Sequence, residues 1–138
     1  MNPAELPIPT ITPEAAPYWE GARQGKLLLQ RCGACDALRF YPRTLCPSCW
    51  SDRVEWTEAS GRGSVHSFTV IHRAPTAAFA SQVPYVVALI DLQEGPRMMA
   101  NVIGDGARDL RIDDAVRVTF EQRAGGFMLP QFVRVTSS

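Results

Sequence analysis

The chain of 138 residues contains four cysteines, arranged as two C-x-x-C pairs, Cys32 with Cys35 and Cys46 with Cys49. A C-x-x-C turn directs its two sulfurs toward one point, and two such turns on adjacent loops supply four thiolates to a tetrahedral site. The spacing therefore predicts one structural zinc ion whose coordination sphere is closed to substrate. Iron bound by the same sulfurs is the chemical rival, and a redox dithiol is a weaker one.

The rest of the sequence bears on the compartment and on the alternative of two disulfides. The N-terminus lacks the basic and apolar segments of a signal peptide, and no apolar run reaches the roughly 20 residues of a membrane span. We therefore expect a cytoplasmic protein without a membrane segment. Disulfides are rare in such a reducing compartment, which favours metal ligation by the cysteines.

Proline and glycine positions divide the chain into an arm and two modules. Residues 1–17 contain five prolines and are expected to form an extended arm, because proline interrupts helices. A short helix is predicted from Tyr18 to Gly25, where the glycine ends it. This helix and the cysteine ribbon form the first module, 18–58, and the second module is predicted at 59–138.

The second module has the two-residue periodicity of a β-protein. Five strands are predicted, at 63–73, 84–92, 96–103, 116–121 and 127–135. A short helix or helical turn is expected within 104–115, between the third and fourth strands. Three strands, a helical linker and two strands is the order of a five-stranded OB-fold barrel. The predicted fold class is thus mainly β: a short helix and a zinc ribbon, followed by an OB-fold barrel.

Motifs around the cysteines resemble those of a known family. The resemblance rests on Tyr18-Trp19-Glu20-Gly21, Gly25 to Cys32 (GKLLLQRC), Phe40-Tyr41-Pro42-Arg43, Cys46-Pro47-Ser48-Cys49 and Gly61 to Val70 (GRGSVHSFTV). Over residues 17–135 the chain is similar to thiolase-associated proteins in which a rubredoxin-like zinc ribbon precedes an acyl-CoA-associated OB-fold domain. One departure is Asp113-Asp114-Ala115, where the family favours a Gly-x-Pro turn. Because aspartate tolerates turn conformations, the fold prediction stands.

The resemblance implies an accessory role rather than a catalytic one. Members of this family accompany thiolase-like enzymes or are fused to acyl-CoA hydratases, in lipid, sterol and polyketide-like metabolism. The partner would carry the catalytic groups for condensation or retro-aldol cleavage. The ribbon and barrel would dock onto that partner and help to hold the acyl-CoA.

Candidate contacts in the ribbon are aromatic and basic. Arg39 and Arg43 flank Phe40 and Tyr41, and arginine suits the phosphates of coenzyme A because it can donate two parallel hydrogen bonds. A solvated charged surface is the alternative interpretation of these arginines. Zinc alone cannot provide a core for so small a ribbon, so Trp50 and Trp56 are expected to pack on its apolar side.

Candidate contacts in the barrel lie on the first strand and the loop after it. His66 and His72 are spaced by six, which predicts that they share a strand face with Phe68. No nucleophile or paired carboxylate motif accompanies them, so no catalytic residue is predicted. His72, Arg73 and Phe79 are instead candidate contacts to coenzyme A or to a partner, because this loop borders the ligand face of OB folds. A plain solvent loop is the alternative.

Two other functions compete with the accessory-subunit hypothesis. The protein could bind acyl-CoA alone, as a carrier or sensor. It could also bind single-stranded nucleic acid, as many zinc ribbons and OB barrels do. Fourteen basic residues balance fourteen acidic ones, and the chain has one lysine. A net charge of zero gives no overall electrostatic attraction to nucleic acid, which argues against this function.

Overall fold

The computed structural model describes residues 6–135. Near its N-terminus, the positions of the prolines determine where helical structure begins. A 3₁₀ turn, η1 (Pro13–Ala15), leads directly into the helix α1 (Ala16–Arg23), with prolines in the first turn of each. Helical structure thus begins inside the segment predicted to be extended, because proline is tolerated in a first helical turn. Gly25, with φ of 78°, follows the end of α1. Residues 1–5 of the predicted arm lie outside the described residues.

The cysteine ribbon is a small antiparallel sheet. Its strands are β1 (Leu28–Cys32), β2 (Leu38–Arg39) and β3 (Val54–Glu58), in the order β2-β1-β3. Cys32 ends β1 opposite Val54, so the first cysteine pair begins where the ladder stops. The long loop between β2 and β3 carries the second pair.

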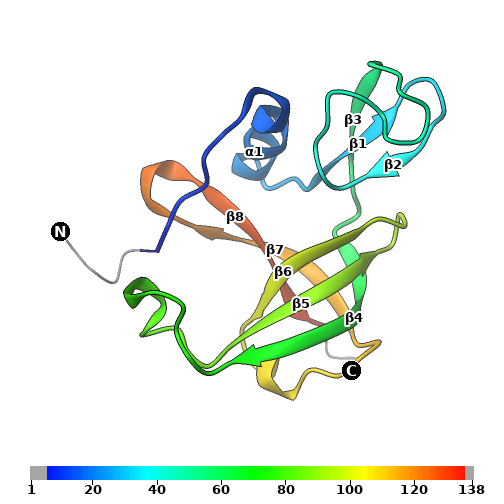
Figure 1. The fold of residues 1–138 in the computed structure, drawn as a ribbon. Helices are drawn as coiled ribbons and strands as arrows, with labels where there is room; N and C mark the ends of the chain where they lie inside the picture. The colour runs from blue at the N-terminus through cyan, green and yellow to red at the C-terminus, as the bar shows by residue number, and fades with distance from the viewer. Residues whose placement is uncertain (1–5, 136–138) are drawn as a thin grey trace.

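The second part of the chain is a closed barrel of five strands (Figure 1). Its strands are β4 (Arg62–Ile71), β5 (Tyr85–Leu92), β6 (Arg97–Ile103), β7 (Ala115–Gln122) and β8 (Met128–Arg134). They close in the order β4-β5-β6-β8-β7, with β6 and β8 parallel and the other neighbours antiparallel. This confirms the predicted mainly β fold with an OB-type barrel.

The connections contain single turns of 3₁₀ helix. These are η2 (Ala77–Phe79) after β4, η3 (Ala107–Asp109) after β6 and η4 (Ala124–Gly126) after β7. The helical linker expected within 104–115 is therefore no more than η3. Gly104 and Gly106 before it, and Asp113 after it, have positive φ values that a longer helix would not allow. The α-helix in the described residues, α1, is too short to cross a membrane.

A β-bulge in β4 overturns one prediction. The register between β4 and β5 shifts between Val65 and Ser67, so the alternation of inward and outward side chains changes phase there. Phe68 packs against the core, whereas His66 is exposed to solvent. His72 lies beyond the end of β4. The expectation that the two histidines share a strand face with Phe68 is wrong, because strict alternation does not survive the bulge.

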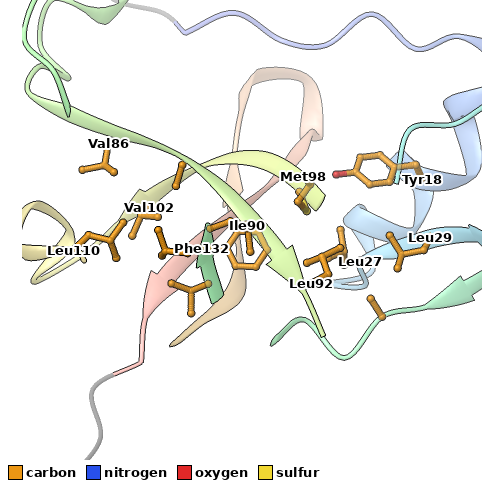
Figure 2. Packing of buried hydrophobic residues seen from close by; sticks show 14 residues of the cluster. Tyr18, Leu27, Leu29, Val86, Ile90, Leu92, Met98, Val102, Leu110 and Phe132 are labelled. Carbon is orange, nitrogen blue, oxygen red and sulfur yellow. The ribbon is translucent and has the colours of Figure 1, made fainter. Parts of the chain in front are cut away.

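The ribbon and the barrel share one hydrophobic core. Tyr18 of α1, and Leu27 and Leu29 at the start of the ribbon, belong to the same buried cluster as the barrel residues Leu92 and Met98 (Figure 2). All five side chains are buried. The two parts are consequently held together by apolar packing and not only by the connecting chain.

Close packing explains the glycine of the W-E-G motif. A Cβ atom on Gly21 would lie 2.6 Å from the Cδ1 atom of Leu28. Glycine therefore lets α1 approach the first ribbon strand and seat Tyr18 in the shared core.

Candidate functional site

The two C-x-x-C turns have matching backbone geometry. The N–H of Asp36 donates to the carbonyl of Cys32 at 2.9 Å, and the N–H of Trp50 donates to the carbonyl of Cys46 at 2.8 Å. Asp36 and Trp50 follow the second cysteine of each pair, and both are left-handed, with φ of 67° and 65°. The chain thus builds the same knuckle twice, on adjacent loops.

The four sulfurs meet at one point. The Sγ atoms of Cys32 and Cys49 are 3.5 Å apart, those of Cys35 and Cys46 are 3.6 Å apart, and all four lie within 4.8 Å of one another. A disulfide requires about 2.05 Å, so these are free thiols. Zinc–sulfur bonds of about 2.3 Å in a tetrahedron give sulfur–sulfur edges of about 3.8 Å, which fits this arrangement.

Backbone donors favour the thiolate form of the first cysteine of each pair, where they help to lower the pKa of Cys32 and Cys46. The N–H groups of Cys35 and Ala34 point at the sulfur of Cys32, at 3.4 and 3.3 Å, and lower the pKa of that thiol to about 6. A thiolate is the form that binds zinc. Four sulfurs leave no coordination position for water or substrate, so the zinc supplies structure to the ribbon and does no hydrolytic chemistry.

The tryptophans of the ribbon behave differently from one another. Trp56 on β3 packs against the shared core, as predicted. Trp50 does not pack on the ribbon, because the left-handed turn of the second knuckle points it outward, where 78% of it is exposed. Tyr41 and Leu45 of the same loop are also exposed. We call these three residues the ribbon loop triad.

The two arginines predicted to bind coenzyme A phosphates are connected to a buried glutamine. The side-chain Oε1 of Gln30 accepts hydrogen bonds from the Nε of Arg39 at 2.7 Å and from the backbone N–H of Arg43 at 2.8 Å. Arg39 also donates to the carbonyl of Arg43. The guanidinium of Arg43 lies 5.4 Å from the ring centre of Tyr41. Arg39 thus shapes the loop from within, and Arg43 remains exposed beside an aromatic ring.

A groove of about 410 Å³ lies where the helix and ribbon meet the barrel. Its walls are mostly aromatic and aliphatic, with residues from α1, the ribbon and strands β5, β6 and β8. The lining residues are Tyr18, Trp19, Phe40, Phe79, Tyr85, Val87, Met98, Met99, Ala100, Asn101, Leu129, Pro130 and Gln131. Burial raises the pKa of Tyr18 far above its ordinary value, so its phenol stays neutral. The groove is therefore uncharged along its lining.

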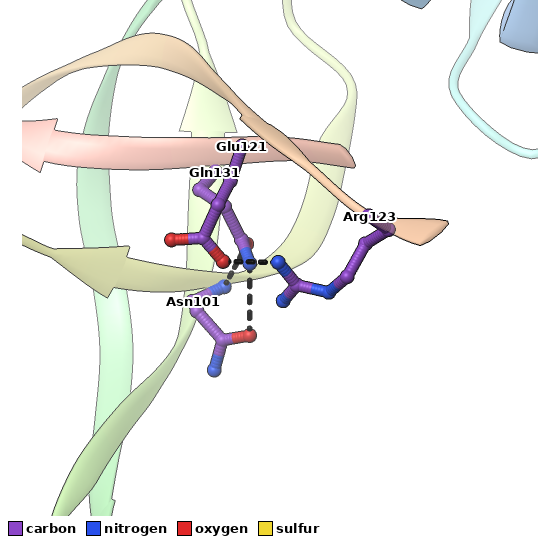
Figure 3. A network of polar contacts seen from close by, with 4 residues as sticks. All are labelled: Asn101, Glu121, Arg123 and Gln131. Carbon is purple, nitrogen blue, oxygen red and sulfur yellow. Dashed lines mark hydrogen bonds and ion pairs between the residues drawn. The ribbon is translucent and has the colours of Figure 1, made fainter. Parts of the chain in front are cut away.

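Two carboxamides form the polar spot of this groove. Gln131 of β8 is buried, and its Oε1 accepts from the backbone N–H of Asn101 on β6 at 3.3 Å. Its Nε2 donates to the side-chain oxygen of Asn101 at 3.4 Å (Figure 3). The parallel β6–β8 register spans only Val102↔Phe132 and Ile103↔Val133, so this pair extends the contact where the ladder is short.

The structure separates the candidates predicted in the loop after β4. Phe79, in η2, lines the groove and lies 5.6 Å from Tyr85, centre to centre. His72 and Arg73 are exposed and do not line it. Asn101 and Gln131 were not predicted, since an isolated amide in a strand has no motif. The alternation of β6 and β8 indicates that both amides face outward from the barrel. It does not indicate that they are neighbours, because the two strands come together only when the barrel closes.

The fold and the site define a protein built from a four-cysteine zinc ribbon and an OB-fold barrel. Comparison with protein-family models agrees: the ChsH2 rubredoxin-like zinc ribbon domain matches residues 19–55, and the ChsH2 C-terminal OB-fold domain matches residues 56–121. The chain belongs to this ChsH2 family, also called DUF35, as its resemblance to the thiolase-associated zinc-ribbon proteins predicted.

Three similar proteins are described as enzyme complexes or as subunits of enzymes. A solved structure described as an Ltp2-ChsH2(DUF35) aldolase is 37% identical, with a TM-score of 0.83 over 92% of this chain and 98% of that one. A probable enoyl-CoA hydratase alpha subunit of Thermomonospora curvata is 38% identical over 91% of this chain. The chain spans only 39% of that subunit. The benzoylsuccinyl-CoA thiolase subunit BbsA of Thauera aromatica is 34% identical, over 75% of this chain and 64% of its own.

Proposed function

We propose that this chain is a non-catalytic accessory subunit of an acyl-CoA-processing complex. It docks onto a thiolase-like or hydratase-like enzyme and helps to hold the CoA ester while the partner performs condensation, retro-aldol cleavage or hydration. Relatives described as an aldolase complex, a hydratase subunit and a thiolase subunit support this proposal. Their names all refer to multi-chain enzymes or to their subunits.

The observation that carries the docking proposal is the exposed ribbon loop triad of Tyr41, Leu45 and Trp50. Large apolar and aromatic side chains at the surface are typical of protein interfaces, where tryptophan and tyrosine supply much of the binding energy. The zinc knuckle gives this loop a fixed shape before it meets a partner. A docking function therefore accounts for a Trp50 conformation that packing within the chain does not require.

The groove supports the accessory role in a different way. Among the residues that line it there is no histidine, cysteine, lysine, arginine or carboxylate. The groove thus lacks the imidazole, thiol, amine and carboxylate groups that usually act as bases or nucleophiles on thioesters, and the raised pKa of Tyr18 keeps its phenol neutral. The lack of basic residues also argues against nucleic acid at this face.

The groove favours one alternative, a protein that binds acyl-CoA by itself. Both functions can be tested by co-expressing the chain with each thiolase-like or hydratase-like enzyme of its source organism. The expected result is co-elution in gel filtration and faster acyl-CoA turnover by the complex than by the enzyme alone, with no turnover by the chain. Tight acyl-CoA binding by the chain without any co-eluting enzyme would instead establish the carrier, and salt-sensitive oligonucleotide binding would establish the nucleic-acid function.

A further inference from the structure

The groove lies at the part of an OB barrel that is suited to ligands. Its long wall is formed by β5 and β6, the second and third strands of the barrel, and Phe79 comes from the loop between the first two strands. In OB folds this face and this loop bind extended chains. Here α1 supplies the opposite wall through Trp19, so the face becomes a groove rather than an open sheet.

The lining selects the chemistry of the occupant. Its uncharged walls accept methylene and methyl groups and disfavour phosphate or carboxylate groups, which would lose their solvation there. The guanidinium beside the carboxamides, that of Arg123, is already paired with Glu121 (Figure 3). A volume of about 410 Å³ is enough for a narrow organic chain. The groove is thus suited to a neutral and mostly aliphatic chain.

The carboxamide pair adds a requirement for polar groups in that chain. Asn101 uses one Nδ2 proton on the carbonyl of Val86, at 2.9 Å, and Gln131 uses one Nε2 proton on Asn101. Each amide nitrogen has a second proton, and the Oδ1 of Asn101 has a second lone pair. These remaining donors and the acceptor match the C=O and N–H groups of amides.

We propose that the groove binds the pantetheine arm of the CoA thioester, with Asn101 and Gln131 pairing with its amides and the nucleotide phosphates outside. Pantetheine is a slim, neutral, aliphatic chain that contains two amide groups. This inference rests on the proposed function and names which part of the CoA ester the chain holds, and where.

A matched pair of substitutions on one strand tests the groove. Val87 lines it, whereas Leu89, two residues further along the same face of β5, does not. In the complex with the partner enzyme, Val87→Trp should fill the groove and weaken butanoyl-CoA binding at least about tenfold in calorimetry. Leu89→Trp should leave that affinity unchanged. Adenosine 3′,5′-bisphosphate, which lacks the pantetheine arm, should bind both variants and the unaltered complex alike.

A second measurement does not depend on how Val87→Trp folds. In the unaltered complex, butanoyl-CoA should slow hydrogen exchange in β6 and in the segment around Phe79, and adenosine 3′,5′-bisphosphate should not. Unchanged exchange there, or equal butanoyl-CoA affinity in both variants, would overturn the groove assignment while leaving the accessory role intact. Loss of partner co-elution in Val87→Trp alone would overturn it too, by showing that the groove receives protein. Failure of the unaltered chain to co-elute would count against the accessory role itself.

Discussion

The Oε1 atom of Gln30 accepts a hydrogen bond from the Nε of Arg39 at 2.7 Å, and the glutamine side chain is buried. The same oxygen accepts the backbone N–H of Arg43, so one buried atom fixes both ends of the segment between these arginines. The Q-R-C motif before the first cysteine therefore acts through its glutamine, which shapes the start of the loop that carries the ribbon loop triad.

Replacing this glutamine should destabilise the ribbon. Gln30→Leu keeps the size but removes the acceptor, which leaves two donors without their partner, and we expect a loss of about 1–3 kcal/mol in the free energy of unfolding. Urea denaturation measures it. Gln24→Leu, at the exposed position that follows α1, is the control and should change stability by less than about 0.5 kcal/mol. Equal effects of the two substitutions would refute the structural role of Gln30.

Metal content and stability should fall together when one ligand is removed. The purified protein is expected to contain one zinc ion, and Cys49→Ser should lose it, because three thiolates and a hydroxyl bind zinc far less tightly than four thiolates. Elemental analysis and native mass spectrometry measure the metal. Ser48→Ala, in the same knuckle, should retain the zinc and the stability. Iron in the native protein, or two disulfides, would contradict the zinc assignment.

Trp50 should matter for association more than for folding. Trp50→Gly removes an exposed side chain and relieves a left-handed backbone conformation that is unfavourable for a bulky residue. We expect unchanged stability, or a gain of up to about 1 kcal/mol, together with at least about tenfold weaker binding of the partner enzyme. Asp36→Gly makes the same backbone change in the other knuckle and should leave that binding intact. Equal binding by both variants, measured by surface plasmon resonance, would exclude Trp50 from the interface.

The ion pair between Arg97 and Asp91 on the barrel surface should be visible in a titration. The guanidinium of Arg97 donates to Asp91 at 2.6 Å and holds the pKa of that carboxyl below its ordinary value. Because the folded-state pKa is depressed, the contribution of this pair to stability exists above the unfolded-state pKa of about 3.9 and disappears as the pH falls through the folded-state value. Carbon-detected NMR should show the pKa of Asp91 rising in Arg97→Gln and unchanged in Arg108→Gln.

The sequence predicts those features that depend on near neighbours in the chain. Each knuckle is a local turn, so the spacing of Cys32, Cys35, Cys46 and Cys49 was enough to predict the metal site. Strand alternation likewise predicted the five barrel strands. The groove escaped prediction because Asn101 and Gln131 come together only through the parallel contact of β6 with β8. The bulge beside His66 escaped it because one extra residue in a strand leaves no mark in composition.

The core that Tyr18, Leu27 and Leu29 share with Leu92 and Met98 has a mechanical consequence. It ties the start of the ribbon to the barrel, so the orientation of the ribbon relative to the groove is set when the chain folds. A partner that grips the ribbon would receive the groove at one distance and in one orientation. The subunit would then set the position of a ligand in the groove relative to the catalytic groups of the partner.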